Sequence, residues 1–162
     1  MSRAFVKEDG PDNAPLPDLP ISPHPNFVTS RGLTLLQAAL SEAQARLAGL
    51  RARVDRLDRL PEAAAERDIR YLEARLKSAI PVPLAGDCDA VAFGHRVSVL
   101  DEGGADAVYT IVGEDEADAS AGLIAPHSPL GRALIGAQCG DVVTWRRPAG
   151  AKELEITGIA WP

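Results

Sequence analysis

LTLLQAALSEAQARLAGLRARVDRL, residues 33–57, repeats apolar residues at alternating spacings of three and four. These positions are Leu33, Leu36, Leu40, Ala43, Leu47, Leu50, Val54 and Leu57. A heptad seam of nearly four repeats predicts one helix that packs against another helix. Ser30 or Thr29 can cap the N-terminus of this helix.

A second seam follows at Ala65, Ile69, Leu72, Leu76 and Ala79. Proline is tolerated in the first turn of a helix but not in its interior, so we expect the chain to reverse around residues 58–61. Pro81 and Pro83 end the second helix. Residues 28–83 are therefore predicted to form an antiparallel coiled-coil hairpin. A dimerising coiled coil and two helices of a bundle remain alternatives, because periodicity alone does not separate them.

The N-terminal residues 1–27 have a different composition. Six prolines lie between Pro11 and Pro25, and few large apolar residues are available to pack. Proline fixes the backbone φ angle and removes a hydrogen-bond donor. We expect a solvated, proline-rich disordered tail or a polyproline II segment, with a proline-rich ligand for another domain as the alternative.

Residues 84–162 switch to the period-two pattern of strands. Residues 91–100 (VAFGHRVSVL), the turn DEGGAD and residues 107–113 predict one hairpin, and residues 141–147 with 152–161 predict a second. Ser128 as N-cap and Pro129 at the first helical position indicate a short helix over 129–136. The fold class is thus predicted to be α+β, a helical hairpin followed by a small antiparallel β domain with one short helix.

Composition narrows the function classes. The net charge is −6, which argues against binding along a phosphate backbone, and residues 28–83 are basic on balance whereas residues 84–162 are acidic. No apolar run is long enough for a membrane span or a secretory signal, so we expect a cytoplasmic protein without a membrane partner. Cys88 and Cys139 lack metal-ligand spacing, and no metal site is predicted.

Several segments together resemble the Gre family of bacterial transcription factors. FGHRVSVLDEGG, YTIVGEDEAD, LIAPHSPLGRALIGAQCGDVV and ELEITGIAW are similar to successive parts of the C-terminal domain of that family, and FVTSRGLTLLQAAL and RDIRYLEARLKSAIPV are similar to the base of its coiled coil. The resemblance implies an FKBP-like C-terminal domain and RNA polymerase as the partner. It also implies that Ser128, Pro129 and Arg132 contact the polymerase.

The tip of the hairpin departs from the family pattern. The resemblance implies two acidic residues there that help hold a magnesium ion in the polymerase and so promote cleavage of backtracked RNA. VDRLDRLPEAAAERDI, residues 54–69, has no glycine, no Glu-Asn pair and no aromatic residue. The hairpin also lacks about two heptads, which retracts the tip by roughly 10 Å. Asp55, Asp58 and Glu62 are the weak candidates that keep the tip acidic.

These observations predict a monomeric RNA polymerase-binding regulator of transcription that is not an enzyme by itself and needs no cofactor of its own. It would place a shortened coiled coil at the secondary channel without recognising a nucleic-acid sequence. The alternative is an active transcript cleavage factor that uses Asp55, Asp58 or Glu62 with a magnesium ion shared with the polymerase. Prolyl isomerisation is disfavoured, because the chain has only seven aromatic residues and few lie where one pocket could gather them.

Overall fold

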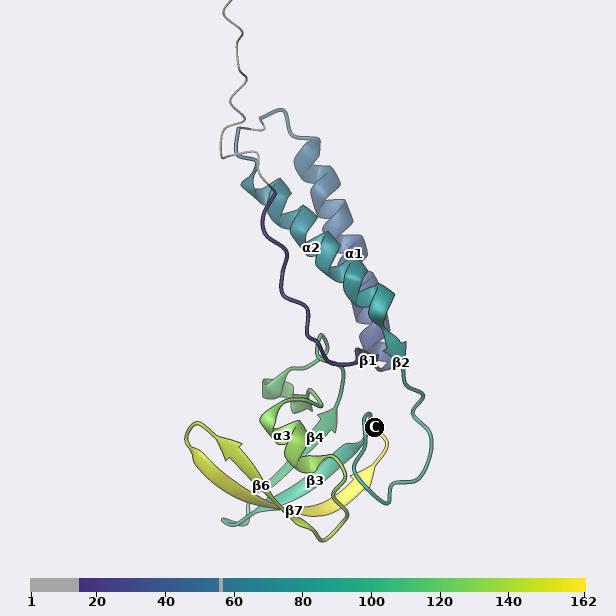
Figure 1. Ribbon diagram of the computed structural model, residues 1–162, viewed down its shortest axis with the longest axis vertical. Helices are drawn as coiled ribbons and strands as arrows, with labels where there is room; N and C mark the ends of the chain where they lie inside the picture. The colour runs from purple at the N-terminus through teal and green to yellow at the C-terminus, as the bar shows by residue number, and fades with distance from the viewer. Residues whose placement is uncertain (1–14, 56) are drawn as a thin grey trace, which may run out of the picture. The chain divides into compact units, whose positions relative to one another are not determined.

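The protein is described by a computed structural model that covers residues 15–55 and 57–162 (Figure 1). Contacts within the chain divide it into two compact units. The first unit joins residues 37–77 to the N-terminal residues up to Ser22, and the second joins Pro23–Leu36 to Ser78–Pro162. The base of the first helix therefore belongs with the C-terminal unit, whereas the sequence predicted a boundary near residue 84.

Two helices, α1 (Ser30–Arg51) and α2 (Leu60–Ser78), form the predicted hairpin. The heptad residues Ala43 and Leu47 of α1 and Ala65 of α2 are buried. Arg46 bonds Asp68 at 2.7 Å and Arg51 bonds Glu66 at 2.6 Å. Because these ion pairs are partly exposed, each contributes little, and apolar burial along the seam holds the helices together.

The first helix ends earlier than its heptad pattern predicts. The seam continues to Leu57, but α1 ends at Arg51, and residues 52–55 and 57–59 lie between the helices. Val54 and Leu57 are almost fully exposed, at 106% and 93%. Since α2 begins only at Leu60, these apolar positions have no facing helix to bury them, and heptad spacing without such a partner does not extend a helix.

Part of the predicted disordered tail is ordered against α2, so that prediction is wrong for its second half. Residues 1–14 lie outside the described residues, but residues 15–22 run along α2 (Figure 1). The Arg70 guanidinium donates to Asp18 at 2.6 Å and to the carbonyl of Leu16 at 2.9 Å. Proline prevents a helix here but leaves an extended chain with free carbonyls that a side chain can bind.

The C-terminal unit is a five-stranded sheet with one short helix. The strands are β3 (Arg96–Asp101), β4 (Asp106–Ile111), β5 (Leu123–Ile124), β6 (Val142–Arg147) and β7 (Gly150–Ala160), in the order β5-β4-β3-β7-β6. All neighbours are antiparallel except β4 and β5. The predicted α+β class and both predicted hairpins are confirmed, and the sheet differs only in being mixed. The connection from β4 to β5 contains a 3₁₀ turn, η2 (Ala119–Ala121).

A single apolar core lies under this sheet. It gathers alternate residues of the strands and the inner face of α3 (Pro129–Leu134). Its buried members are Val91, Val97, Val99, Ile111, Ile124, Leu130, Leu134, Leu154 and Ile156. The period-two pattern therefore has its expected cause, since one face of each strand is inside.

A small parallel pair ties the base of the hairpin to the C-terminal unit. Strand β1 (Phe27–Val28) pairs with β2 (Ile80–Pro81), and the backbone N–H of Ile80 donates to the carbonyl of Asn26 at 2.8 Å. Phe27 also contacts Phe93, with ring centroids 5.8 Å apart. This pairing explains why residues 23–36 cluster with the sheet instead of with the rest of the hairpin.

Candidate functional site

The helix that carries the predicted polymerase contacts is fixed by its own cap. The Ser128 hydroxyl accepts the backbone N–H of Gly131 at 3.0 Å and donates to the carbonyl of Ala125 at 2.8 Å. Pro129 occupies the first turn of α3, where the lack of an N–H costs nothing. The predicted roles of Ser128 as N-cap and Pro129 as first helical residue are confirmed.

The helix lies very close to the preceding backbone. A Cβ atom on Gly131 would come within 2.2 Å of the carbonyl oxygen of Ala125 and 2.8 Å of that of Pro126. Only glycine permits this approach. As a result, the backbone of α3 packs directly on the 125–126 segment, and this contact fixes the position of the helix.

The residues of α3 divide between core and surface. Leu130 and Leu134 are buried in the core, whereas Pro129 and Arg132 are exposed and Ile135, just after the helix, is 41% exposed. The exposed set forms a surface of mixed apolar and cationic character. The two buried leucines therefore anchor α3 in the core.

A pocket adjoins the N-terminus of α3. It has a volume of about 420 Å³. Its walls come from β4, η2, β5, the start of α3, the end of β6 and the β6–β7 turn: Tyr109, Ala119, Ile124, Ser128, Pro129, Leu130, Trp145, Arg146, Arg147 and Pro148. Two of the three predicted contact residues, Ser128 and Pro129, therefore line one concave surface, and Arg132 lies outside its lining.

Aromatic residues shape this pocket. The rings of Tyr109 and Trp145 meet edge to face with centroids 6.3 Å apart, and the guanidinium of Arg147 stacks on Trp145 at 5.1 Å. Few aromatic residues were expected to lie where one pocket could gather them, and two of the seven line this pocket. Their signal in the sequence was weak, since the two lie in strands 36 residues apart whose pairing to β3 and β7 brings them to one face.

The three acidic candidates at the hairpin tip do not form a cluster. Asp55 and Asp58 are exposed, and each accepts the backbone N–H two residues ahead, from Leu57 at 3.1 Å and Leu60 at 3.0 Å. Glu62 is only 7% exposed and lies in α2. Within residues 15–55 and 57–162, no group of three metal-ligating side chains comes together at the tip or elsewhere.

A buried carboxylate in the acidic loop was missed from the sequence. Glu116 accepts the hydroxyl of Thr29 at 2.5 Å and the guanidinium of Arg31 at 2.8 Å. Thr29 in turn accepts the backbone N–H of Gly32 at 2.8 Å, so these side chains cap the start of α1. No local sequence pattern links Glu116 to Thr29, because the two residues are 87 positions apart.

Further polar side chains of the C-terminal unit also have structural surroundings. His95 is buried, accepts the backbone N–H of Ala92 at 3.1 Å and contacts Trp161 edge to face. Both cysteines are free, Cys88 half-buried and Cys139 exposed.

The Lys152 ammonium, and then the N–H groups of the β3–β4 turn, hold the pKa of Asp101 below its usual range. None of the helices among the described residues is both long and apolar enough for a membrane crossing.

Comparison with known proteins gives a consistent result. A family model described as the C-terminal part of the transcription elongation factor GreA/GreB matches residues 86–160. Transcription elongation factor GreA of Thioalkalivibrio sulfidiphilus is 42% identical over 99 residues, 59% of this chain and 63% of that protein. GreA of Rhodospirillum rubrum is 40% identical over 106 residues, 60% of this chain and 67% of that protein. The chain thus spans just under two thirds of the length of the first relatives that it matches.

Solved structures were matched as well. GreA factor homolog 1 of Thermus thermophilus has 25% identity and a TM-score of 0.42, with 85% of this chain and 99% of that chain covered. A GreA/GreB elongation factor from Nitrosomonas europaea has 22% identity and a TM-score of 0.42, with 84% and 99% covered.

The curated relatives correct one prediction from the sequence. The chain was expected not to be an enzyme, and this is wrong, because its relatives at 40–50% identity are named transcription elongation factor GreA. That is the class of factor for which the resemblance described above implies transcript cleavage by the polymerase. The prediction relied on missing tip residues, and a changed tip motif does not remove the exposed carboxylates of Asp55 and Asp58.

Proposed function

The chain belongs to the GreA/GreB family of transcription elongation factors, and on that premise we propose that it acts on RNA polymerase by docking through the surface around α3. The observation that carries this proposal is the pocket beside Ser128 and Pro129, which is lined by Tyr109 and Trp145. Aromatic residues, arginine and a concave apolar wall are typical of the centre of a protein interface.

The cap and the close approach of α3 support this assignment. The docking residues must be held rigidly to gain affinity, since ordering a mobile loop on binding costs free energy. Ser128 fixes the start of α3, and Gly131 lets it lie against residues 125–126. Pro129 and Arg132 then project from a pre-organised element, and the 28–83 hairpin is the arm directed to the secondary channel.

Binding to purified polymerase from the same organism tests the docking surface. Arg132→Ala and Arg147→Ala should each weaken binding by about tenfold, as expected for arginines near an interface centre. Arg96→Ala is the matched control, because Arg96 is an exposed arginine of β3 outside the pocket. Equal binding by all variants would contradict docking at this surface.

Stimulated transcript cleavage is the finer candidate function. The observation in its favour is that Asp55 and Asp58 are exposed, with carboxylate oxygens that can face a metal ion held by the polymerase. Glu62 is not retained as a candidate, since it is buried in α2. A halted elongation complex with magnesium present should release short 3′ RNA fragments when the protein is added, and Asp55→Asn with Asp58→Asn should abolish the release while leaving binding intact.

Binding without release of fragments would assign the protein to regulation of elongation by channel occupancy. The two outcomes are distinguishable because docking is measured separately from cleavage. Loss of both binding and release in the tip variant would contradict the division of roles between the hairpin tip and the α3 surface. We also propose a monomeric, cytoplasmic protein, which sedimentation and cell fractionation would test.

A further inference from the structure

We propose that the outer face of the hairpin is a docking site for a polyproline II segment, that residues 15–22 fill this site in cis, and that their docking stabilises α2. Residues 15–22 are called the strap below. Its sequence is PLPDLPIS. The proposal concerns the first unit alone and does not rest on polymerase binding, so the two can fail independently.

Burial along the strap follows a period of three. Leu16, Leu19 and Ser22 are half-buried, while the residues between them are exposed: Pro15, Pro17, Asp18, Pro20 and Ile21. A polyproline II helix has three residues per turn, so positions i, i+3 and i+6 share one face. The strap therefore has an inner and an outer face, which a randomly placed tail would not have.

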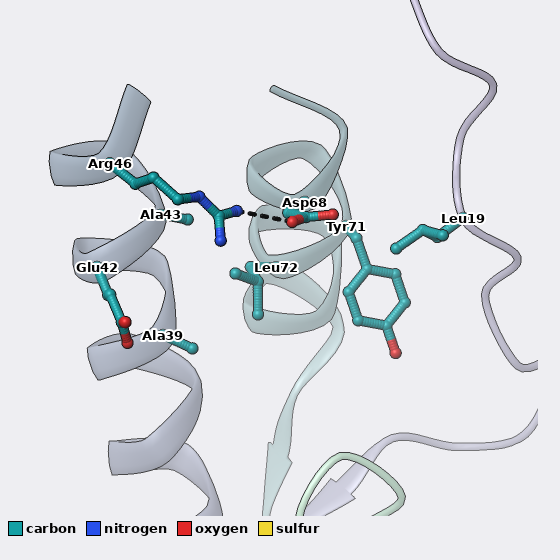
Figure 2. A pocket seen from close by; sticks show the side chains of 8 residues that line it. All are labelled: Leu19, Ala39, Glu42, Ala43, Arg46, Asp68, Tyr71 and Leu72. Atoms are coloured by element: carbon teal, nitrogen blue, oxygen red, sulfur yellow. Dashed lines mark hydrogen bonds and ion pairs between the residues drawn. The ribbon is translucent and has the colours of Figure 1, made fainter. Parts of the chain in front are cut away.

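The hairpin offers a groove that fits this inner face. A cavity of about 310 Å³ lies between the strap and the two helices. Figure 2 shows Leu19 approaching from the strap on the side of Tyr71, with Leu72 and the small side chains of Ala39 and Ala43 opposite. Two alanines on one face of α1 leave the space, and the Arg46–Asp68 ion pair borders it (Figure 2).

One arginine recognises the strap by both its side chain and its backbone. Arg70 Nε donates to Asp18 Oδ1 at 2.6 Å, and Arg70 Nη2 donates to the carbonyl of Leu16 at 2.9 Å. A polyproline II backbone has no internal hydrogen bonds, so its carbonyls are available to such a donor. The planar guanidinium can hold both acceptors at once, which a lysine would not do with the same geometry.

A hairpin of this length gains from a third element. Helices of about 20 residues are marginal unless an apolar face is covered, and two helices alone leave an outer face open. The strap brings Leu19 to the side of Tyr71 (Figure 2), and its prolines have little backbone freedom to lose on docking. Its covalent connection gives it a local concentration on the order of millimolar, so modest contacts keep it docked.

Hydrogen–deuterium exchange of the full-length free protein tests the proposal. The readout is exchange in peptides covering residues 60–78. Leu19→Ser should speed exchange there by about fivefold, since half-burial of one leucine side chain is lost. Ile21→Ser is the matched control, because Ile21 lies on the outer face at 49% exposure and its replacement should leave exchange unchanged.

A charge reversal provides a second and independent arm. Arg70→Glu should also speed exchange, and adding Asp18→Arg to that variant should restore part of the protection by re-forming the pair with opposite polarity. Equal effects of Leu19→Ser and Ile21→Ser, or no effect of Leu19→Ser, would overturn the proposal. Protection that increases with protein concentration would assign the groove to the strap of a second copy and overturn the cis assignment.

Discussion

The α3 surface and the hairpin tip are both candidate contact sites, but different kinds of interaction fix the positions of their residues. At α3 the positions are determined by long-range packing: Leu130 and Leu134 sit in the sheet core, and Gly131 touches backbone six residues earlier. At the tip they are determined locally by Asp55 and Asp58, each bonded two residues ahead. The family model matches residues 86–160, which include α3 and not the tip.

This difference indicates which positions tolerate amino-acid substitution. A core residue of the C-terminal unit, such as Leu134 or Ile156, is fully buried among the other core residues, so a change there disturbs the packing of the sheet. Val54 and Leu57 have few partners, so the tip can change its residues and even its length without loss of the fold. A single family can therefore keep one docking geometry while its tips diverge in chemistry.

The largest expected effect comes from replacing glycine by alanine, which is compared at one position in each region. Gly131→Ala should destabilise the C-terminal unit by about 3 kcal/mol or more, because the new methyl would overlap the carbonyls of Ala125 and Pro126. Gly49→Ala should instead stabilise the hairpin by about 0.5–1 kcal/mol, since nothing lies within 4 Å of the new atom in a helix. Urea unfolding measures the change in unfolding free energy for each variant, and changes of the same sign would contradict the difference inferred between the two regions.

The next effect concerns the carboxylate that caps α1. Glu116→Ala should cost about 1–3 kcal/mol, because it leaves the Thr29 hydroxyl and Arg31 without their buried acceptor. Glu102→Ala is the control, as Glu102 is exposed in the β3–β4 turn. Thermal unfolding followed by circular dichroism compares the two, and a cost for Glu102→Ala as large as that for Glu116→Ala would contradict this role.

Much of the fold could be predicted from the sequence, and the failures have one cause. The heptads up to Leu50, the period-two strands and the Ser128–Pro129 cap are local patterns, and each is present as predicted. Glu116, the Tyr109–Trp145 pair and the strap on Arg70 depend on residues 36 to 87 positions apart. No local sequence pattern indicates contacts between residues so far apart. The first helix was predicted to extend too far toward the tip, because apolar heptad positions are helical only where a second helix faces them.

A smaller effect is expected at the tip itself. Asp58→Ala should destabilise the hairpin by about 0.5–1 kcal/mol, because the carboxylate accepts the N–H of Leu60, the first residue of α2. Asp87→Ala, which removes an exposed carboxylate elsewhere, should have no effect. Exchange of peptides from residues 60–78 is the readout, and spread of the Asp58→Ala effect into the sheet would contradict the local control inferred for the tip.

The smallest effect depends on pH. Lys152 and the turn N–H groups lower the pKa of Asp101 in the folded protein, so its stabilising contribution is present at neutral pH and is lost as pH falls through the folded pKa. Asp101→Asn should therefore be less stable than the parent at pH 7, and the difference should shrink toward pH 2. Urea midpoints across this range measure it, and a difference that grows on acidification would contradict the assigned direction.

The central claim is that polymerase docking lies at α3 and its pocket, and one binding titration tests it most directly. Full-length Arg132→Ala and Leu57→Ser are compared with the parent for affinity to purified polymerase. Docking at α3 should give about tenfold weaker binding for Arg132→Ala and a much smaller change for Leu57→Ser. Unchanged binding of Arg132→Ala together with strong loss for Leu57→Ser would contradict it and assign docking to the exposed apolar tip.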